Sequence, residues 1–150
     1  MSIKHIEILT LNYRQTQSAG KVLAEEILET SGQKSFVLGL EGELGGGKTT
    51  FLQGFAQGLG IKEKITSPTF VIMKRFKIKN LKFKNFYHFD CYRIQKAEEI
   101  SVTGLKEIIS DPQNIVAIEW SERIKKIMPK NALRLSFVYM GKDKRKIVIE

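Results

Sequence analysis

The segment at residues 42–49 constrains this chain more than any other. It reads G-E-L-G-G-G-K-T and matches the pattern G-x-x-x-x-G-K-[ST], in which glycines let the backbone approach phosphate groups. Residues 35–41 before it are mostly apolar, as in a buried parallel strand. After it, apolar residues recur at helical spacing, at Phe51, Leu52, Phe55 and Leu59. A strand that leads into such a loop, followed at once by a helix, aims backbone N–H groups at one anion. The segment therefore predicts a phosphate-binding P-loop.

Length and composition describe one ordinary domain. The chain has 150 residues, 42% of them apolar and 27% charged, so residues 1–150 are expected to form a single P-loop ATPase domain. The only cysteine, Cys91, excludes an internal disulfide, and no Cys/His cluster indicates structural zinc. No apolar run approaches the roughly 20 residues of a membrane span, and residues 1–6 do not resemble a signal peptide. We expect a cytoplasmic protein without a membrane partner.

The pattern along the chain predicts alternating strands and helices. Strands are expected at residues 3–11, 35–41 and 115–120, and helices from near Thr16, from Lys48 to Gly60, and over 97–110 with a break near Gly104. Two antiparallel hairpins are expected, at 69–90 and 132–150. The fold class that follows is α/β: a three-layer P-loop NTPase-like domain with a mixed sheet, made of a parallel core plus antiparallel hairpin strands.

Two carboxylates stand where a P-loop protein needs them. Lys48 would reach the β and γ phosphates, and Thr49 would offer its hydroxyl to Mg²⁺. Asp90 and Glu119 each end a predicted strand, at the sheet edge where such chains hold metal or activate water. We expect Asp90 to bind Mg²⁺, and Glu119 to orient or deprotonate water or to hold Mg²⁺ through one. His88 is expected to be packed rather than catalytic.

Three other positions are weaker candidates. Ser67 to Phe70 (S-P-T-F) lie some twenty residues after the P-loop, where Thr69 could sense the γ-phosphate, although such a segment also simply starts a strand. Thr16 suits a helix N-cap first and a ligand contact second. Trp120, the only tryptophan, directly follows Glu119, so it either belongs with Thr69 to a nucleotide-state switch or is packed in the core.

Taken together, these blocks resemble the TsaE (YjeE) family, the bacterial ATPases that support threonylcarbamoyladenosine synthesis in tRNA. The matching blocks are G-E-L-G-G-G-K-T-T, S-P-T-F, H-F-D-C-Y-R at 88–93 and E-W at 119–120, with Thr16 and Gly20 in the helix opening T-x-x-x-G-x-x-L-A. The departures are mild, because Glu43 stands for Asp, Gly46 for Ala and Cys91 for Leu.

The resemblance implies a mixed-sheet P-loop fold, slow Mg²⁺-dependent ATP hydrolysis and association with the TsaD and TsaB proteins, with tRNA contact in that complex left open. It also gives the full candidate site. The catalytic candidates are Lys48, Asp90 and Glu119, and the metal candidates are Thr49, Asp90 and Glu119. The nucleotide-binding candidates are Thr16, Gly42, Glu43, Leu44, Gly45, Gly46, Gly47, Lys48, Thr49 and Thr50.

Two other functions fit parts of the sequence. A small-molecule P-loop kinase needs a basic lid, but the stretch after Asp90 holds Arg93 and then Glu98 and Glu99. A nucleic-acid-binding NTPase would use the basic hairpin at 74–84, whose lysines alternate with aromatic residues. The net charge of +9 permits this, although 19 of the 25 basic residues are Lys and specific phosphate recognition favours Arg.

Overall fold

In the part of the chain that the structure describes, seven strands form one sheet in the order β1-β7-β6-β2-β5-β4-β3. The computed structural model describes residues 5–30, 33–43, 46–66 and 72–150. The strands are β1 (Ile6–Thr10), β2 (Phe36–Glu41), β3 (Met73–Lys77), β4 (Asn85–Asp90), β5 (Asn114–Glu119), β6 (Leu133–Tyr139) and β7 (Arg145–Ile149). The strand that leads into the P-loop, β2, is thus the fourth of the seven, with β6 on one side and β5 on the other.

The sheet is mixed, as the sequence predicts. β2 runs parallel to β5 and β6, and β5 runs parallel to β4. The pairs β1/β7, β6/β7 and β3/β4 are antiparallel. Because β2, β4 and β5 are parallel, their carboxyl ends meet at one edge of the sheet. There, Glu119 pairs with Leu40 on one side and with Asp90 on the other.

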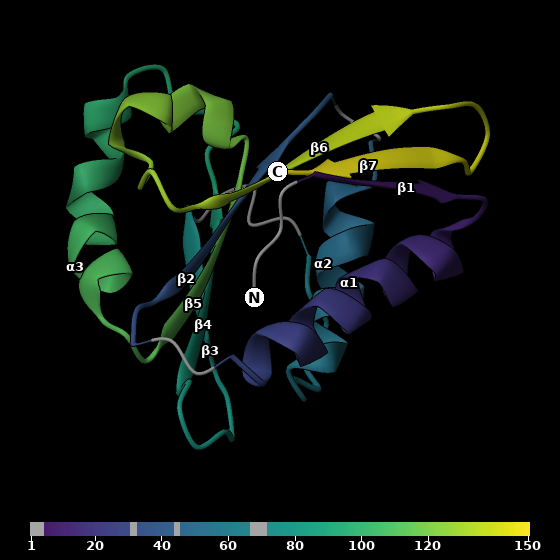
Figure 1. Cartoon of the computed structure of the whole chain (residues 1–150). Coiled ribbons are helices and arrows are strands. Elements are labelled where there is room, and N and C mark those ends of the chain that lie inside the picture. The colour runs from purple at the N-terminus through teal and green to yellow at the C-terminus, as the bar shows by residue number, and fades with distance from the viewer. Residues whose placement is uncertain (1–4, 31–32, 44–45, 67–71) are drawn as a thin grey trace.

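Helices cover both faces of the sheet, which gives the three expected layers (Figure 1). α1 (Tyr13–Leu28) and α2 (Lys48–Gly58) pack on one face with an apolar core that includes Phe51 and Phe55. The other face carries η1 (Ala97–Thr103), α3 (Leu105–Ser110) and η2 (Ser121–Ile127) over a second core around Ile118. In the part of the chain that the structure describes, none of these helices combines the length and apolarity needed to cross a bilayer.

α1 and α2 touch through glycine. A Cβ atom on Gly20 of α1 would lie 2.1 Å from the carbonyl oxygen of Phe51, and one on Gly54 of α2 would lie 1.8 Å from that of Gln17. Both distances are far below van der Waals contact, so only glycine allows the two backbones to approach this closely. The contact fixes α2, and with it the P-loop lysine at its first position, against the rest of the domain.

Several element boundaries differ from the expectations. α1 begins at Tyr13, and its N-cap is Asn12, whose side chain accepts from Gln15 N at 2.9 Å. Thr16 therefore lies inside the helix and is not its cap. The first hairpin has a longer turn than expected, because Asn80 Oδ1 accepts from the N–H groups of Lys82 and Phe83. η2, which follows β5 directly, is an element that the sequence pattern does not reveal.

Candidate nucleotide-binding site

The P-loop connects β2 to α2 as the sequence predicts. Gly47 is the N-cap of α2, with φ 99°, and Gly42 has φ 136°, a region that favours glycine. The N-cap makes no side-chain hydrogen bond, and the first turn of α2 holds no acidic residue. The first N–H groups of the helix are thus left for an anion. Leu44 and Gly45 lie outside the described residues.

Lys48 is folded back onto its own loop. Its Nζ donates to the carbonyl oxygens of Gly42 and Glu43 and lies 3.9 Å from the ring centroid of Trp120. Burial lowers the pKa of Lys48, while the negative charges of Glu119, Glu122 and Asp90 act in the opposite direction. The ammonium group is therefore buried and held by carbonyl groups of its own loop.

Glu119 connects the helix to the sheet edge. Its side chain is buried, with Oε1 3.3 Å from Thr49 Oγ1 and Oε2 2.6 Å from His88 Nε2. One carboxylate oxygen thus faces the start of α2 and the other is held by the histidine. An oxygen beside the Thr49 hydroxyl is well placed to bind a hard cation or a water molecule.

Asp90 ends the strand next to Glu119. Asp90 and Glu119 are register partners on β4 and β5, and Asp90 Oδ1 accepts from Tyr92 N at 2.9 Å. Within the described residues, no group of three or more His, Cys, Asp or Glu side chains could hold a metal by itself. A P-loop Mg²⁺ needs fewer protein ligands, because phosphate oxygens and waters complete its octahedron. Thr49, Asp90 and Glu119 carry side-chain oxygens of the kind that such a metal would take.

Trp120 is half-buried and packs against the second core, and its ring also contacts the P-loop lysine. It has φ 59°, in the left-handed region that bulky side chains rarely adopt. The centroids of the Trp120 and Tyr92 rings are 5.1 Å apart, and Arg123 Cζ lies 5.3 Å from the centroid of the Trp120 ring. The Lys48 ammonium group contacts the same ring. The backbone turn after Glu119 therefore places the indole beside the P-loop lysine.

The model of the family described as "Threonylcarbamoyl adenosine biosynthesis protein TsaE" matches residues 11–147. This match covers nearly the whole chain and includes every element of the site. The chain belongs to the TsaE family.

Relatives and a solved structure agree with this assignment. The chain is similar to tRNA threonylcarbamoyladenosine biosynthesis protein TsaE of Bacillus subtilis, with 35% identity over 97% of this chain and 85% of that protein. The protein of the same name from Borreliella burgdorferi is 43% identical over 72% of this chain and 75% of its own length. The crystal structure of YdiB from Bacillus subtilis superimposes with a TM-score of 0.76 at 30% identity, covering 99% of this chain and 86% of that chain.

The TsaE-family chain brings together most of the residues that its sequence singles out. Lys48, Thr49 and Glu119 converge at the start of α2, with Asp90 and Trp120 beside them. Ser67 to Phe70, and with them the proposed switch residue Thr69, lie outside the described residues. Within the loop, Glu43 is exposed and Gly46 is buried, and Thr50 is half-buried in the first turn of α2.

The hydroxyl group of Thr16 in this TsaE-family chain already has a hydrogen-bond partner, the hydroxyl group of Thr10. Thr16 is buried, and its Oγ1 lies 2.7 Å from Thr10 Oγ1. His88 is packed, as expected, but its bond to Glu119 was missed. The signal was present in the H-x-D spacing, because residues two apart on a strand share a face. His88 and Asp90 therefore point the same way beside Glu119.

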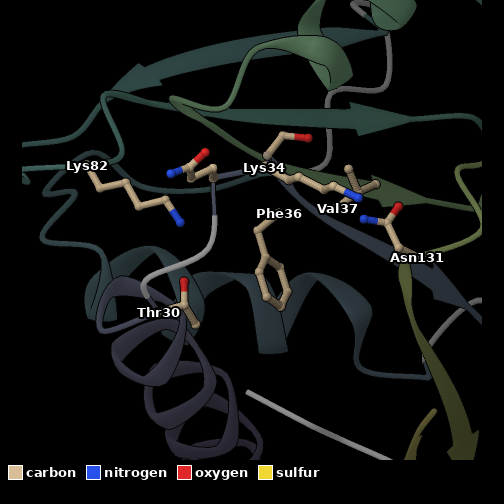
Figure 2. A pocket seen from close by; sticks show the side chains of 8 residues that line it. Thr30, Lys34, Phe36, Val37, Lys82 and Asn131 are labelled. Atoms are coloured by element: carbon tan, nitrogen blue, oxygen red, sulfur yellow. The ribbon is translucent and has the colours of Figure 1, made fainter.

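A separate cavity lies at the opposite end of β2 from the P-loop. It has a volume of about 370 Å³, and Figure 2 shows side chains that line it. The lining residues are Thr30, Gln33, Lys34, Ser35, Phe36, Val37, Lys82 and Asn131. Phe36 and Val37 begin β2, whereas the P-loop follows its last residue, so in this TsaE-family chain the cavity is distinct from the nucleotide site. Its lining includes no carboxylate and no cysteine.

Proposed function

We propose that this chain binds ATP with Mg²⁺, hydrolyses it slowly, and supports threonylcarbamoyladenosine modification of tRNA together with TsaD and TsaB proteins. The observation that carries the proposal is the convergence of Lys48, Thr49 and Glu119 at the N-terminus of α2. Backbone N–H groups, an ammonium, a hydroxyl and a carboxylate at one helix start are the parts that phosphoryl transfer requires. The names of the TsaE relatives supply the process.

Each residue then has a defined part. Lys48 leaves the carbonyl oxygens of Gly42 and Glu43 and binds the β and γ phosphates. The ammonium group binds negatively charged phosphate oxygens more strongly than it binds neutral carbonyl oxygens. Glu119 presents Oε1 toward the start of α2, because His88 holds Oε2. Thr49, Asp90 and Glu119 are the residues that would hold Mg²⁺, which neutralises phosphate charge when bound.

Nucleotide turnover with and without TsaD and TsaB tests the proposal. We expect weak hydrolysis by the chain alone and stimulation when both partners are added. Lys48→Ala should abolish Mg-ATP binding in a calorimetric titration, and affinity within about twofold of the parent would contradict the site. Transfer of phosphate to a metabolite, in place of stimulation by the partners, would favour a small-molecule kinase.

Glu119→Gln separates binding from chemistry in the same assay. The amide keeps the size of the side chain but loses the charge that acts on water or metal. We therefore expect nucleotide affinity to be retained and turnover to fall by about 10² or more. A Glu119→Gln variant that turns over at half the parent rate would refute the assignment.

Exposed basic side chains at one edge of the sheet favour contact with tRNA in the complex. β3 is the edge strand, and its side chains Lys74, Arg75 and Lys77 are exposed. Within the described residues, none of the three has a carboxylate within 4.0 Å. Reversing Lys74 and Lys77 together to Glu should weaken tRNA binding and flatten its salt dependence. Unchanged affinity and salt slope would rule out this edge.

A further inference from the structure

Three connections between helices and strands build the cavity at the far end of β2. Lys34 lies between α1 and β2, Lys82 between β3 and β4, and Asn131 between η2 and β6. Because β4, β5 and β6 run in the same direction as β2, their amino ends meet at one edge of the sheet. The P-loop lies at the other edge, after the last residue of β2. The cavity therefore has polar side chains of its own and shares none with the candidate nucleotide site.

Two lysines give the cavity a positive charge that its own side chains do not balance. Lys34 is exposed and Lys82 is half-buried. Among the described residues, no carboxylate lies within 4.0 Å of either ammonium group. The lining of the cavity contains no aspartate or glutamate. Partial burial makes the interaction of Lys82 with a bound anion stronger than it would be in open solvent.

The cavity offers a ligand mainly N–H donors. The hydroxyl group of Thr30 donates to the carbonyl oxygen of Ile27 at 2.8 Å. The hydroxyl group of Ser35 donates to the carbonyl oxygen of Ile109. Neither hydroxyl group therefore has a proton left for a ligand. The side-chain amide of Asn131 adds N–H donors to those of the two ammonium groups. A negatively charged ligand that accepts several hydrogen bonds suits such a lining.

Lys82 is anchored at the cavity before any ligand binds. Asn80 Oδ1 accepts from the N–H groups of Lys82 and Phe83, at 2.9 and 3.0 Å, which fixes the turn between β3 and β4. Lys82 Nζ lies 4.5 Å from the centroid of the buried Phe83 ring. In Figure 2, Lys82 and Asn131 extend toward the cavity from opposite sides, with Phe36 between them. Donors that are already oriented lose less side-chain entropy when a ligand binds.

We propose that this cavity binds the phosphate monoester of a small organic molecule. Two ammonium groups balance the charge of about −1.5 to −2 that a phosphate monoester carries at neutral pH, whereas one carboxylate would leave a lysine unbalanced. Lysine binds phosphate as a point charge, and the lining has no arginine, whose planar fork matches a carboxylate.

The same cavity has room and apolar surface for the organic part of the ligand. Phe36 and Val37 belong to the lining. The volume of about 370 Å³ lies near the lower end of the roughly 300–1,000 Å³ of small-molecule sites. A phosphate alone would leave Phe36 and Val37 without a partner. The inference does not depend on the proposed ATP-binding function, because the two sites lie at opposite ends of β2.

Nuclear magnetic resonance titrations of the whole chain, labelled with ¹⁵N, test the inference. The probes are phenyl phosphate, benzoate and inorganic phosphate, each added without nucleotide. Signals of Lys34 and Asn131 report on the cavity, and signals of Gly47 and Lys48 report on the P-loop.

Three variants accompany the parent in these titrations. A double variant, Lys34→Gln with Lys82→Gln, removes both charges, and Asn131→Asp places a carboxylate in the lining. The matched control is Lys79→Gln, because Lys79 is exposed on the same turn as Lys82 and does not line the cavity. Thermal unfolding of each variant checks that the domain remains folded.

We expect phenyl phosphate to shift the signals of Lys34 and Asn131 in a saturable manner. The double variant should bind it about tenfold or more weakly, and Asn131→Asp should also weaken it, because like charges repel. Lys79→Gln should stay within about twofold of the parent.

Each other outcome would overturn a stated part of the inference. Benzoate that binds as tightly as phenyl phosphate would overturn the preference for phosphate, and inorganic phosphate that binds as tightly would overturn the organic part. Saturable shifts at Gly47 and Lys48 alone, no saturable shift at all, or an unchanged affinity of the double variant would overturn the cavity as a binding site. Loss of Mg-ATP binding by Lys48→Ala, measured separately, tests the proposed function and leaves this inference untouched.

Discussion

His88 holds one oxygen of Glu119, with Nε2 2.6 Å from Oε2 and both side chains buried. The histidine comes from β4 and the glutamate from the end of β5, and the second oxygen of Glu119 is 3.3 Å from the Thr49 hydroxyl. A carboxylate fixed at one oxygen can present the other in a single direction. On this geometry, His88 would act on the candidate site through Glu119.

Replacing His88 should lower turnover more than it lowers binding. His88→Ala removes the bond that orients Glu119, so we expect the catalytic rate to fall by roughly 10-fold or more while Mg-ATP affinity changes little. His88→Gln is the matched variant, because its amide can still donate to the carboxylate, and it should recover part of the rate. Equal rates for the two variants would mean that His88 only fills space.

The Mg²⁺ dependence of hydrolysis should change when Asp90 is replaced. Asp90 lies beside Glu119 at the sheet edge, and an amide is a weaker ligand for a hard cation than a carboxylate. We expect Asp90→Asn to require more Mg²⁺ for half-maximal turnover. The measurement is turnover against Mg²⁺ concentration at fixed ATP. An unchanged curve would place Asp90 outside the metal's coordination.

Tryptophan fluorescence should report the nucleotide state. Trp120 is the only tryptophan, and its indole is in contact with the Lys48 ammonium, 3.9 Å from the ring centroid. Because phosphate should draw the ammonium away, we expect a spectral change on nucleotide binding and a difference between ATP-analogue and ADP states. Thr69→Ala should erase that difference and spare ADP binding. Identical spectra in the two states would remove the switch.

The thiol of Cys91 should be unreactive in the folded protein. Burial, with the negative charges of Asp90 and Glu122, raises its pKa to about 12 from 9.0. At pH 8 the native protein should therefore react with a disulfide reagent far more slowly than the urea-unfolded chain. A raised pKa means that the group supports folding below pH 9 and that this support is lost as the pH rises toward 12. Equally fast reaction of native and unfolded protein would contradict this environment.

A methyl group at Gly20 should destabilise the contact between α1 and α2. Its Cβ would lie 2.1 Å from the carbonyl oxygen of Phe51, so the helices must separate. We expect Gly20→Ala to reduce the free energy of unfolding by about 1–3 kcal/mol. Lys21→Ala, an exposed change on the same helix, should stay within about 0.5 kcal/mol. Urea titrations of both variants measure the difference.

Patterns within short stretches of the sequence predicted the individual strands and helices of this fold. They did not predict which strands far apart in the chain pair with each other. Apolar runs and turn residues gave the seven strands and both hairpins, and the P-loop motif gave α2. Nothing local indicated that β6 would pair with β2, or that β1 would pair with β7, because such pairings depend on packing of the whole sheet.

The candidate site likewise contains residues that the sequence predicts and contacts that it does not predict. Lys48 and Thr49 follow from one contiguous motif, and Asp90 and Glu119 follow from strand ends. The contacts of Arg145 with Gly47 and of Lys48 with Trp120 join segments far apart in the chain. Strand periodicity places residues on a face, but it does not say which distant face they meet. Those contacts became visible only in three dimensions.

The pairing of β1 with β7 also has a consequence for the order of folding. Ile6 lies opposite Ile149, so β1, which pairs with β7 alone among the described strands, finds its neighbour only after β7 has been synthesised. The P-loop and α2 emerge much earlier, yet β6 and Arg145, which pack against the loop, come near the end. Closure of such long loops slows folding. A nascent chain would thus carry the G-x-x-x-x-G-K-T segment long before the strands that surround it are all in place.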